Sequence, residues 1–509
     1  MNWLFRSNLL VLVVLGLALA AAWIVWPFGR LAPTGQAAPK PLEGRDQEIV
    51  WLDPATSAVN WERFVAATRR FVADRKDITL DDSNAFPSQT TAVPEIALAL
   101  GPGKPRLWFR WYKLTGDLGP RQWVRALAKR FPPPLAIIGG GTSDRARDLA
   151  WELNDLPGYP STKPLMLITS ATAVKVYLDG ETKELMRIYP DRSFRFCFTN
   201  HQMAKAVAEF IWNHEDLRPD SQPVYLVGWK DDPYSEDLSE QFHEMVVKYL
   251  AELNSEQPFL TQTILYSVGS FNQPNVWEED AVERIVNVLG QHPEQQRPLL
   301  VLPAMPQPAR RFLRGLARTD PVRAGRFVVA TGDGIDFNTI YRDRNLAWPI
   351  QDLPCTLVFF CHRNPVDPSA FREDRPSGDQ APPDPNEKTT TGTQDLLLYR
   401  DIVETVATAA AHENGWLDRA DDFRQRLTEL QFPDGTPRFN SQGNQRPGAS
   451  EYVGVLRPVR DDNRVQPKAL LQVWNRSGVA NGKGHWDLVR ELSVDYRSEP
   501  SVVLREGGP

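Results

Sequence analysis

The chain has 509 residues, of which 42% are hydrophobic and 24% are charged, as in an ordinary globular protein. That length exceeds what one hydrophobic core usually organises, so we expect two lobes. The net charge of −6 does not favour a nucleic-acid partner, and the three cysteines (Cys197, Cys355 and Cys361) are interpreted as buried thiols rather than as a disulfide framework or metal site.

The first thirty residues predict where the protein is located. Arg6 precedes an uncharged, mostly apolar run over residues 7–29, which is long enough to cross a membrane. We therefore predict an N-terminal transmembrane anchor at 1–30, with the rest of the protein outside the cytoplasm, on the periplasmic side. A cleaved signal peptide, which would release the protein into the periplasm, is the alternative. Residues 31–46 are rich in Pro, Gly and Ala and are interpreted as a linker.

From residue 47 onward, short apolar runs alternate with amphipathic stretches. Alternation of strands and helices, with connections long enough for crossovers, predicts an α/β fold with parallel sheets. The apolar runs predict strands at 48–52, 96–100, 107–112, 135–139, 165–169, 224–229, 262–268, 299–303, 327–331 and 356–361. The apolar spacing predicts helices at 61–72, 122–131, 235–253, 278–289, 308–317, 396–411 and 420–430.

Two regions near the end of the chain depart from this alternation. Residues 367–394 combine Pro, Asp and Gly with a run of Thr, which indicates a flexible surface excursion or, alternatively, a lid over a binding site. The tail from residue 451 contains three further strand-like runs, at 452–456, 470–474 and 491–496.

Small and hydroxylated residues follow two of the predicted strands. Thr142 and Ser143 follow the strand at 135–139, and Ser170, Ala171 and Thr172 follow the strand at 165–169. At the carboxyl ends of parallel strands, such loops present N–H groups and hydroxyls to small anions and zwitterions. We interpret the two loops as the floor of a binding site. The alternatives are that Ser143 is only a helix N-cap and that 170–172 is an ordinary turn.

The sequence offers no positive evidence for an enzyme, a cofactor or a metal site. The glycines at 139–141 lack both the G-x-G-x-x-G order and the Lys-Ser/Thr of a phosphate-binding loop. The seven histidines include no close pair at metal-ligand spacing, and a G-x-S-x-G nucleophile turn is absent. We therefore expect no catalytic residues and no cofactor.

Five segments in the same order resemble the type I periplasmic binding proteins, specifically the branched-chain amino-acid (Leu/Ile/Val) binding branch that serves ABC transporters. The resemblance covers residues 107–460. The segments are the Gly-Gly-Gly-Thr-Ser loop at 139–143, the Ser-Ala-Thr loop at 170–172, the aromatic-Arg strand at 193–200, the Asp-Asp-Pro-Tyr-Ser turn at 231–235 and a Phe/Gly pattern at 432–443. One departure is the turn at 53–57, which contains no glycine where the family has a Gly-rich turn.

The resemblance implies two Rossmann-like lobes, each with a parallel sheet, around a central cleft. Lobe 1 would comprise 47–197 and 355–430, and lobe 2 would comprise 198–354 and 431–509, including a C-terminal extension. The implied function is that of a solute-binding receptor, which closes on an amino acid or similar small polar ligand and delivers it to an ABC permease. A membrane-anchored sensory or orphan receptor, or a scaffold that has lost its ligand site, is the alternative.

The resemblance also assigns roles to individual residues. Family sites hold the ligand carboxylate with hydroxyls and N–H groups and the ammonium with a carboxylate, because both charges need partners once water is removed. Tyr234 would close over the ligand from lobe 2, and Asp333 would pair with its ammonium. The alternatives are that Tyr234 is a half-buried aromatic at a helix start and that Asp333 is a turn residue. The lobe 1 positions would be Thr142, Ser143, Ser170, Ala171 and Thr172.

Overall fold

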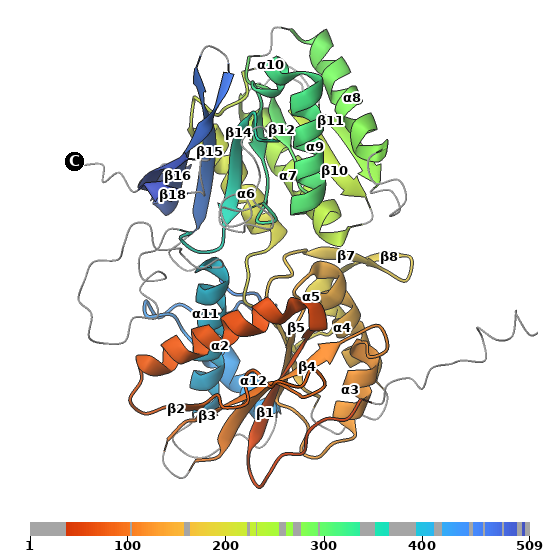
Figure 1. The fold of residues 1–509 in the computed structure, drawn as a ribbon, viewed down its shortest axis with the longest axis vertical. Helices are drawn as coiled ribbons and strands as arrows, with labels where there is room; N and C mark the ends of the chain where they lie inside the picture. Colours follow the sequence, from red (N-terminus) through yellow and green to blue (C-terminus); the bar gives the residue numbers. More distant parts are fainter. Residues whose placement is uncertain are drawn as a thin grey trace, which may run out of the picture.

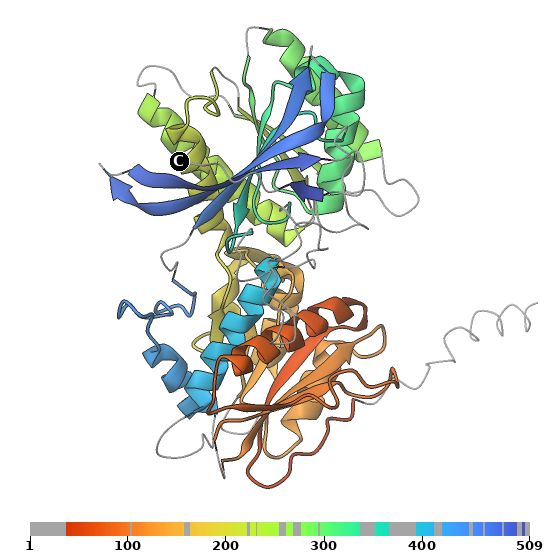
Figure 2. The ribbon, with the colours of Figure 1, turned by 60° about the vertical axis from the view of Figure 1, so that its left-hand side comes forward.

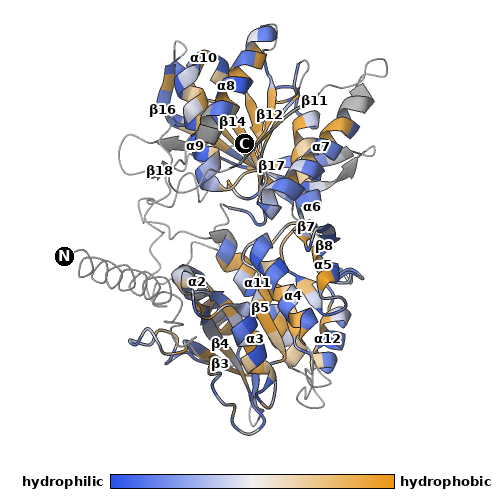
Figure 3. Ribbon diagram, turned by 90° about the vertical axis from the view of Figure 1, so that its right-hand side faces the viewer, coloured by the Kyte–Doolittle hydropathy of each residue, from blue (hydrophilic) through white to orange (hydrophobic). Residues whose placement is uncertain are grey.

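The computed structural model describes two α/β lobes that lie one above the other along the long axis of the molecule (Figure 1). In both lobes the strands at the centre are strongly hydrophobic (Figure 3). The described residues are 37–101, 104–156, 163–220, 224–230, 232–253, 261–267, 276–293, 296–335, 352–365, 393–411, 420–446, 451–461, 464–480, 483–495 and 501–503.

Seven of the described strands form the sheet of lobe 1, in the order β2-β3-β4-β1-β5-β6-β9. The central strands are parallel, whereas β2 and β3 are antiparallel to their neighbours, so the sheet is mixed rather than purely parallel. The strands are β1 (Gln47–Pro54), β2 (Thr79–Asp81), β3 (Glu95–Ala99), β4 (Arg106–Leu114), β5 (Ala136–Gly139), β6 (Leu165–Ile168) and β9 (Ser193–Arg195).

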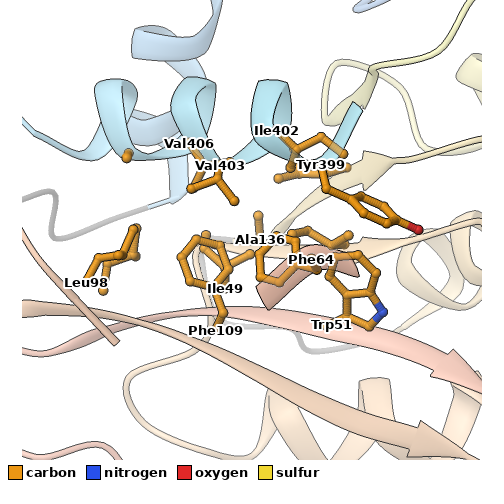
Figure 4. Close-up of a cluster of buried hydrophobic side chains, with 14 of the residues drawn as sticks. Ile49, Trp51, Phe64, Leu98, Phe109, Ala136, Tyr399, Ile402, Val403 and Val406 are labelled. Atoms are coloured by element: carbon orange, nitrogen blue, oxygen red, sulfur yellow. The ribbon is translucent and has the colours of Figure 1, made fainter. Parts of the chain in front are cut away.

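Helices cover both faces of this sheet, which explains why its central strands are almost continuously apolar. Ile49 and Trp51 of β1 face one hydrophobic core, with α2, α11 and α12, whereas Val50 and Leu52 face another, with α3 and α4. In the first core, the apolar face of α11 lies directly over the sheet (Figure 4). The helices are α2 (Ala58–Ala73), α3 (Pro120–Ala128), α4 (Ser143–Asp155), α11 (Thr393–Ala410) and α12 (Ala420–Glu429).

Nine of the described strands form the sheet of lobe 2, in the order β11-β10-β12-β13-β14-β15-β16-β17-β18. β10 to β14 are parallel, and the four C-terminal strands extend the sheet as a ribbon across the lobe, each antiparallel to the strand before it (Figure 2). The strands are β10 (Val224–Lys230), β11 (Thr261–Ser267), β12 (Leu299–Val301), β13 (Val328–Ala330), β14 (Thr356–Cys361), β15 (Tyr452–Asp461), β16 (Arg464–Ala480), β17 (Lys483–Asp495) and β18 (Ser501–Val503).

The helices of lobe 2 also lie on both faces of the sheet. One hydrophobic core lies under α8, α9 and α10, and the other lies under α6 and α7. All three cysteines are buried, as expected from the sequence. The helices are α6 (Asn200–Asn213), α7 (Pro233–Leu253), α8 (Val276–Gln291), α9 (Pro306–Thr319) and α10 (Pro321–Ala324).

The chain crosses between the lobes at positions that differ in part from the expected boundaries. Phe196 belongs to the core of lobe 1 and Phe198 to that of lobe 2, so the chain first crosses near residue 197. β14 pairs with β13 in the second sheet, which places 356–361 in lobe 2 although the expected boundary at residue 355 assigns them to lobe 1. These boundaries depend on which strands pair, and pairing is not a local property of the sequence.

A second boundary also needs correction, because residues 431–446 lie with lobe 1 and not with lobe 2. Phe439 packs against Phe194 and Phe196, and the N–H of Arg195 donates to the carbonyl oxygen of Gly443 at 2.9 Å. From here on, lobe 1 means the described residues of 37–197 and 393–446, and lobe 2 means those of 198–361 and 451–503.

The N-terminal predictions are tested only in part. The anchor at 1–30 lies outside the described residues, and none of the helices within the described ranges is long and apolar enough to span a membrane. The described end of the linker, from residue 37, packs onto lobe 1 rather than hanging free: the Lys40 N–H donates to the Tyr112 hydroxyl at 3.1 Å, and its ammonium lies 2.7 Å from a carboxylate oxygen of Glu95. The excursion at 367–394 is likewise undescribed, except for residues 393–394, which begin α11.

Candidate functional site

The first predicted loop joins β5 to α4 at the carboxyl edge of the lobe 1 sheet. Gly140 has a φ of +72°, and a Cβ there would lie 2.8 Å from the Cβ of Ala146, so glycine lets the helix start close against the strand. Thr142 occupies the N-cap position and Ser143 is the first helical residue, so the alternative that Ser143 is the N-cap is wrong. The Ser143 hydroxyl instead accepts a hydrogen bond from the Ala173 N–H at 3.3 Å.

The second predicted loop follows β6 and lies beside the first. The Ser170 hydroxyl donates to the carbonyl oxygen of Gly141 at 3.1 Å, and the carbonyl of Thr172 accepts from the N–H of Asn200 at 2.8 Å. Ala171 is fully buried. The Thr142 and Thr172 hydroxyls are buried without a hydrogen-bond partner among the described residues. The structure therefore brings the five predicted lobe 1 residues together in two adjoining loops.

Asp53, at the carboxyl end of β1, is a polar residue of this edge that sequence reasoning did not single out. Its side chain accepts from the Asn60 amide at 3.0 Å and lies 3.9 Å from the Arg145 guanidinium. Burial raises the pKa of this carboxyl, and the amide and the guanidinium oppose the rise. The only signal in the sequence was an acidic residue in the glycine-free turn at 53–57.

Next to Asp53, lobe 1 contains an open cavity of about 540 Å³. Its walls come from the ends of β1 and β4 and from the starts of α3 and α4. A cavity of this size falls in the range of small-ligand pockets. It is lined by residues 54–56, 114–116, 119–120, 145 and 148.

The predicted lobe 2 residues, Tyr234 and Asp333, also come together. Tyr234 is in the first turn of α7, and its hydroxyl accepts from the Gly334 N–H at 2.9 Å. A Cβ on Gly332 would lie 2.7 Å from this hydroxyl oxygen, so a glycine there allows the loop after β13 to approach α7. Burial, together with the nearby Asp333 carboxylate, raises the pKa of Tyr234 well above its ordinary value.

His362, directly after β14, is a partner of Asp333 that the sequence did not reveal. Its Nε2 lies 2.7 Å from an Asp333 carboxylate oxygen, and its ring stacks on Phe198 with centroids 5.7 Å apart. Its Nδ1 accepts from the Phe198 N–H at 3.4 Å, so Nε2 carries the proton that is donated to Asp333. In the sequence, His362 is one of seven histidines, none of which forms a close pair at metal-ligand spacing.

Two carboxylates interact across the boundary between the lobes, one at the start of α4 and one just before α7. Asp232, just before α7, accepts from the Ser235 N–H at 3.0 Å. Burial raises the pKa of Asp232 to about 6, and the carboxylate of Asp144, in the first turn of α4, contributes to the rise. Because α4 and α7 are in contact, the two groups of predicted residues lie at a common boundary between the lobes. We call them the lobe 1 wall (Thr142, Ser143, Ser170, Ala171 and Thr172) and the lobe 2 wall (Tyr234 and Asp333).

Comparison with known proteins finds likeness in structure alone. No protein-family model matches the chain, and no curated protein matches its sequence. An ABC transporter substrate-binding protein from Desulfitobacterium hafniense in complex with Leu superposes with a TM-score of 0.50 at 12% identity, over 87% of this chain and 100% of that one.

Two other solved structures fall slightly lower. A leucine-, isoleucine-, valine-, threonine- and alanine-binding protein from Brucella ovis has a TM-score of 0.48 at 13% identity, over 88% of this chain and 95% of its own. A solute-binding protein from R. palustris in complex with 4-hydroxybenzoate has a TM-score of 0.46 at 10% identity, over 88% and 96%. At 12% identity, this likeness shows a shared fold, so the chain has the fold of the Desulfitobacterium hafniense substrate-binding protein, the type I periplasmic binding protein fold.

Proposed function

We propose that the protein is an extracytoplasmic solute-binding receptor. It would close its two lobes on an amino acid or a similarly small polar ligand and deliver that ligand to an ABC permease, without catalysing a reaction. The observation that carries the proposal is that polar residues follow the carboxyl ends of parallel strands in both sheets: the loops at 142–143 and 170–172 in lobe 1, and Tyr234 with Asp333 in lobe 2. Ligands of open α/β sheets bind at this edge.

The chemistry of the two walls suits a zwitterion. Asp333 supplies a carboxylate for an ammonium group, while the buried hydroxyls of Thr142 and Thr172 are free to donate to a carboxylate. Lobe closure would remove water from between the walls and strengthen both interactions. We further propose that residues 1–30 anchor the receptor to the membrane, with both lobes on the periplasmic side.

One observation favours the alternative, a scaffold or sensory domain that has lost amino-acid binding. Asp333, the proposed ammonium partner, already accepts a hydrogen bond from His362. A ligand ammonium would have to displace that imidazole or share the carboxylate with it. A ligand without an ammonium group would meet no such competition.

Thermal unfolding of the full-length chain in detergent, against a panel of amino acids, amides, sugars and small carboxylic acids, tests the proposal. A ligand present at 100 times its Kd should stabilise the protein by about 2.7 kcal/mol, which is visible as a higher Tm. For an amino acid, Asp333→Asn should remove most of this increase, whereas Asp422→Asn, an exposed carboxylate of α12, should leave it unchanged. A panel in which no member raises the Tm would argue for the scaffold that has lost its ligand site.

A further inference from the structure

Asp237 crosses the boundary between the two lobes. It lies in α7 of lobe 2, one turn after Tyr234, and its side chain is only 3% exposed. One carboxylate oxygen accepts from the Val174 N–H at 2.7 Å, and the other accepts from the Lys175 N–H at 3.0 Å. Val174 ends the connection that follows β6, and Lys175 begins β7 (Lys175–Leu178), so one side chain of lobe 2 binds the backbone of lobe 1 at two consecutive residues.

A buried cation holds the same segment from the other side. Arg195, the last residue of β9, is 1% exposed, and its guanidinium donates to the carbonyl oxygens of Thr172 at 3.4 Å and Ala173 at 2.8 Å. In the segment 172–175, the first two carbonyl groups therefore accept from the Arg195 guanidinium, and the last two N–H groups donate to the Asp237 carboxylate. Peptide groups oriented in this way stabilise both buried charges, which would otherwise be costly.

Asn200 completes the arrangement within lobe 2. Its side-chain amide donates to Asp237 at 2.8 Å and to the carbonyl oxygen of Tyr234 at 3.1 Å, and its own N–H donates to Thr172. Asp237 is thus connected to the loop that carries Ser170 and Thr172 in one lobe and to the turn that carries Tyr234 in the other. These are the two proposed ligand walls.

We propose that Asp237 is a positioning residue that couples the closure of the lobes to the geometry of the ligand wall at 170–172. The role of 170–172 as a ligand wall rests on the proposed function, whereas the coupling of Asp237 to the lobe angle does not. A change in the angle between the lobes moves Asp237 relative to lobe 1, and the segment at 172–175 must either follow or lose two charge-assisted hydrogen bonds. The arrangement with both bonds formed is therefore the preferred one, and it shapes the lobe 1 wall before any ligand arrives.

The test uses the ligand-free, full-length protein and the nearly isosteric change Asp237→Asn. An amide has one acceptor oxygen where the carboxylate has two, so one of the two N–H groups loses its partner. We expect hydrogen exchange at the 174 and 175 amides to become about tenfold faster or more, because a hydrogen bond to a charged acceptor favours the protected state of an amide by about that factor. Glu240→Gln is the matched control: it removes an exposed pair with Lys175 at 3.1 Å, also between the lobes, and should leave those amides unchanged.

The separation of the lobes provides a second readout that a merely local role would not change. Spin labels at positions 121 and 284, both exposed and in different lobes, report the distance distribution between the lobes, and the buried native cysteines leave these labels selective. We expect Asp237→Asn to broaden or lengthen this distribution, and Glu240→Gln to leave it as in the wild type. Wild-type exchange rates and distances for Asp237→Asn would overturn the proposal.

Neither outcome depends on a ligand. If Asp237→Asn does not fold, exchange in the unmodified protein decides: the 174 and 175 amides must be protected, and their rapid exchange would overturn the proposal. Failure of every ligand in the thermal panel would remove the proposed function, while the exchange and distance measurements would still decide whether Asp237 couples the lobes.

Discussion

Asp232→Asn should stabilise the folded protein, and increasingly so as the pH rises. The pKa of this carboxyl is raised from 3.8 to about 6 in the folded state, mainly by burial. Because the folded-state pKa lies above the unfolded value, the folded protein binds more protons in this window, and Asp232 weakens stability as the pH increases through it. Asparagine keeps an oxygen for the Ser235 N–H but has no charge to bury.

The magnitude follows from the two pKa values. Ionisation of Asp232 costs about 1 kcal/mol at pH 4.5 and about 3 kcal/mol at pH 7, as upper values for a group that is partly exposed. Asp232→Asn should therefore raise the free energy of unfolding by up to about 3 kcal/mol at pH 7 and by about 2 kcal/mol less at pH 4.5.

Urea unfolding of the full-length protein, followed by tryptophan fluorescence at both pH values, measures this difference. Asp422→Asn is the control, because Asp422 is an exposed residue in the first turn of α12 and its charge is not buried. An Asp232→Asn effect that is the same at both pH values, or a net destabilisation at pH 7, would refute the reasoning. A stabilising change at a site residue would also show that the fold gives up stability to keep a carboxylate there.

Two further changes test the packing of the loop that carries Asp333 and the contact between Asp333 and His362. Gly334→Ala places a methyl carbon 3.0 Å from both a backbone carbonyl oxygen and the Tyr234 hydroxyl, so it should destabilise the protein by about 1–3 kcal/mol in urea unfolding. Gly116→Ala, with open space around the new methyl group, should cost far less; equal losses would contradict the steric argument. His362→Ala removes the imidazole from Asp333 and should lower stability by about 1–3 kcal/mol while strengthening the thermal shift from an ammonium-bearing ligand. A weaker shift would mean that His362 supports the site rather than competing for it.

Local pattern explains which elements could be predicted from the sequence. β14 is found at the expected residues, 356–361, because it is a short apolar run with clear ends. α6 was not among the predicted helices: ten of its fourteen residues are buried, and its polar residues form only a narrow stripe at four-residue spacing (His201, Lys205, Glu209 and Asn213). The hairpin of β7 and β8 (Glu181–Glu184) was also missed, because β8 is polar and lies at the surface.

The candidate site also contains residues that local pattern predicts and residues that it does not. The loops at 142–143 and 170–172 could be placed at one edge because strand ends in a parallel sheet share that edge, and the glycines around Asp333 indicated a tight turn. Asp53, Asp237 and His362 could not be assigned roles, because each acquires its role from a partner distant in the chain. The bonds of Asp237 to residues 174 and 175, for example, join positions more than sixty residues apart.

The amino-acid sequence by itself determined the alternation of strands and helices and the polar loops at the strand ends, since these follow from side-chain patterns over a few residues. Two lobes were expected from the chain length and from the resemblance to the binding-protein family. Only the tertiary structure decided that 356–361 belong to lobe 2 and 431–446 to lobe 1, that the His362 imidazole contacts Asp333, and that Asp237 binds the backbone of lobe 1. Periodicity is a property of neighbouring residues, whereas strand pairing and buried charge contacts exist only once distant segments have met.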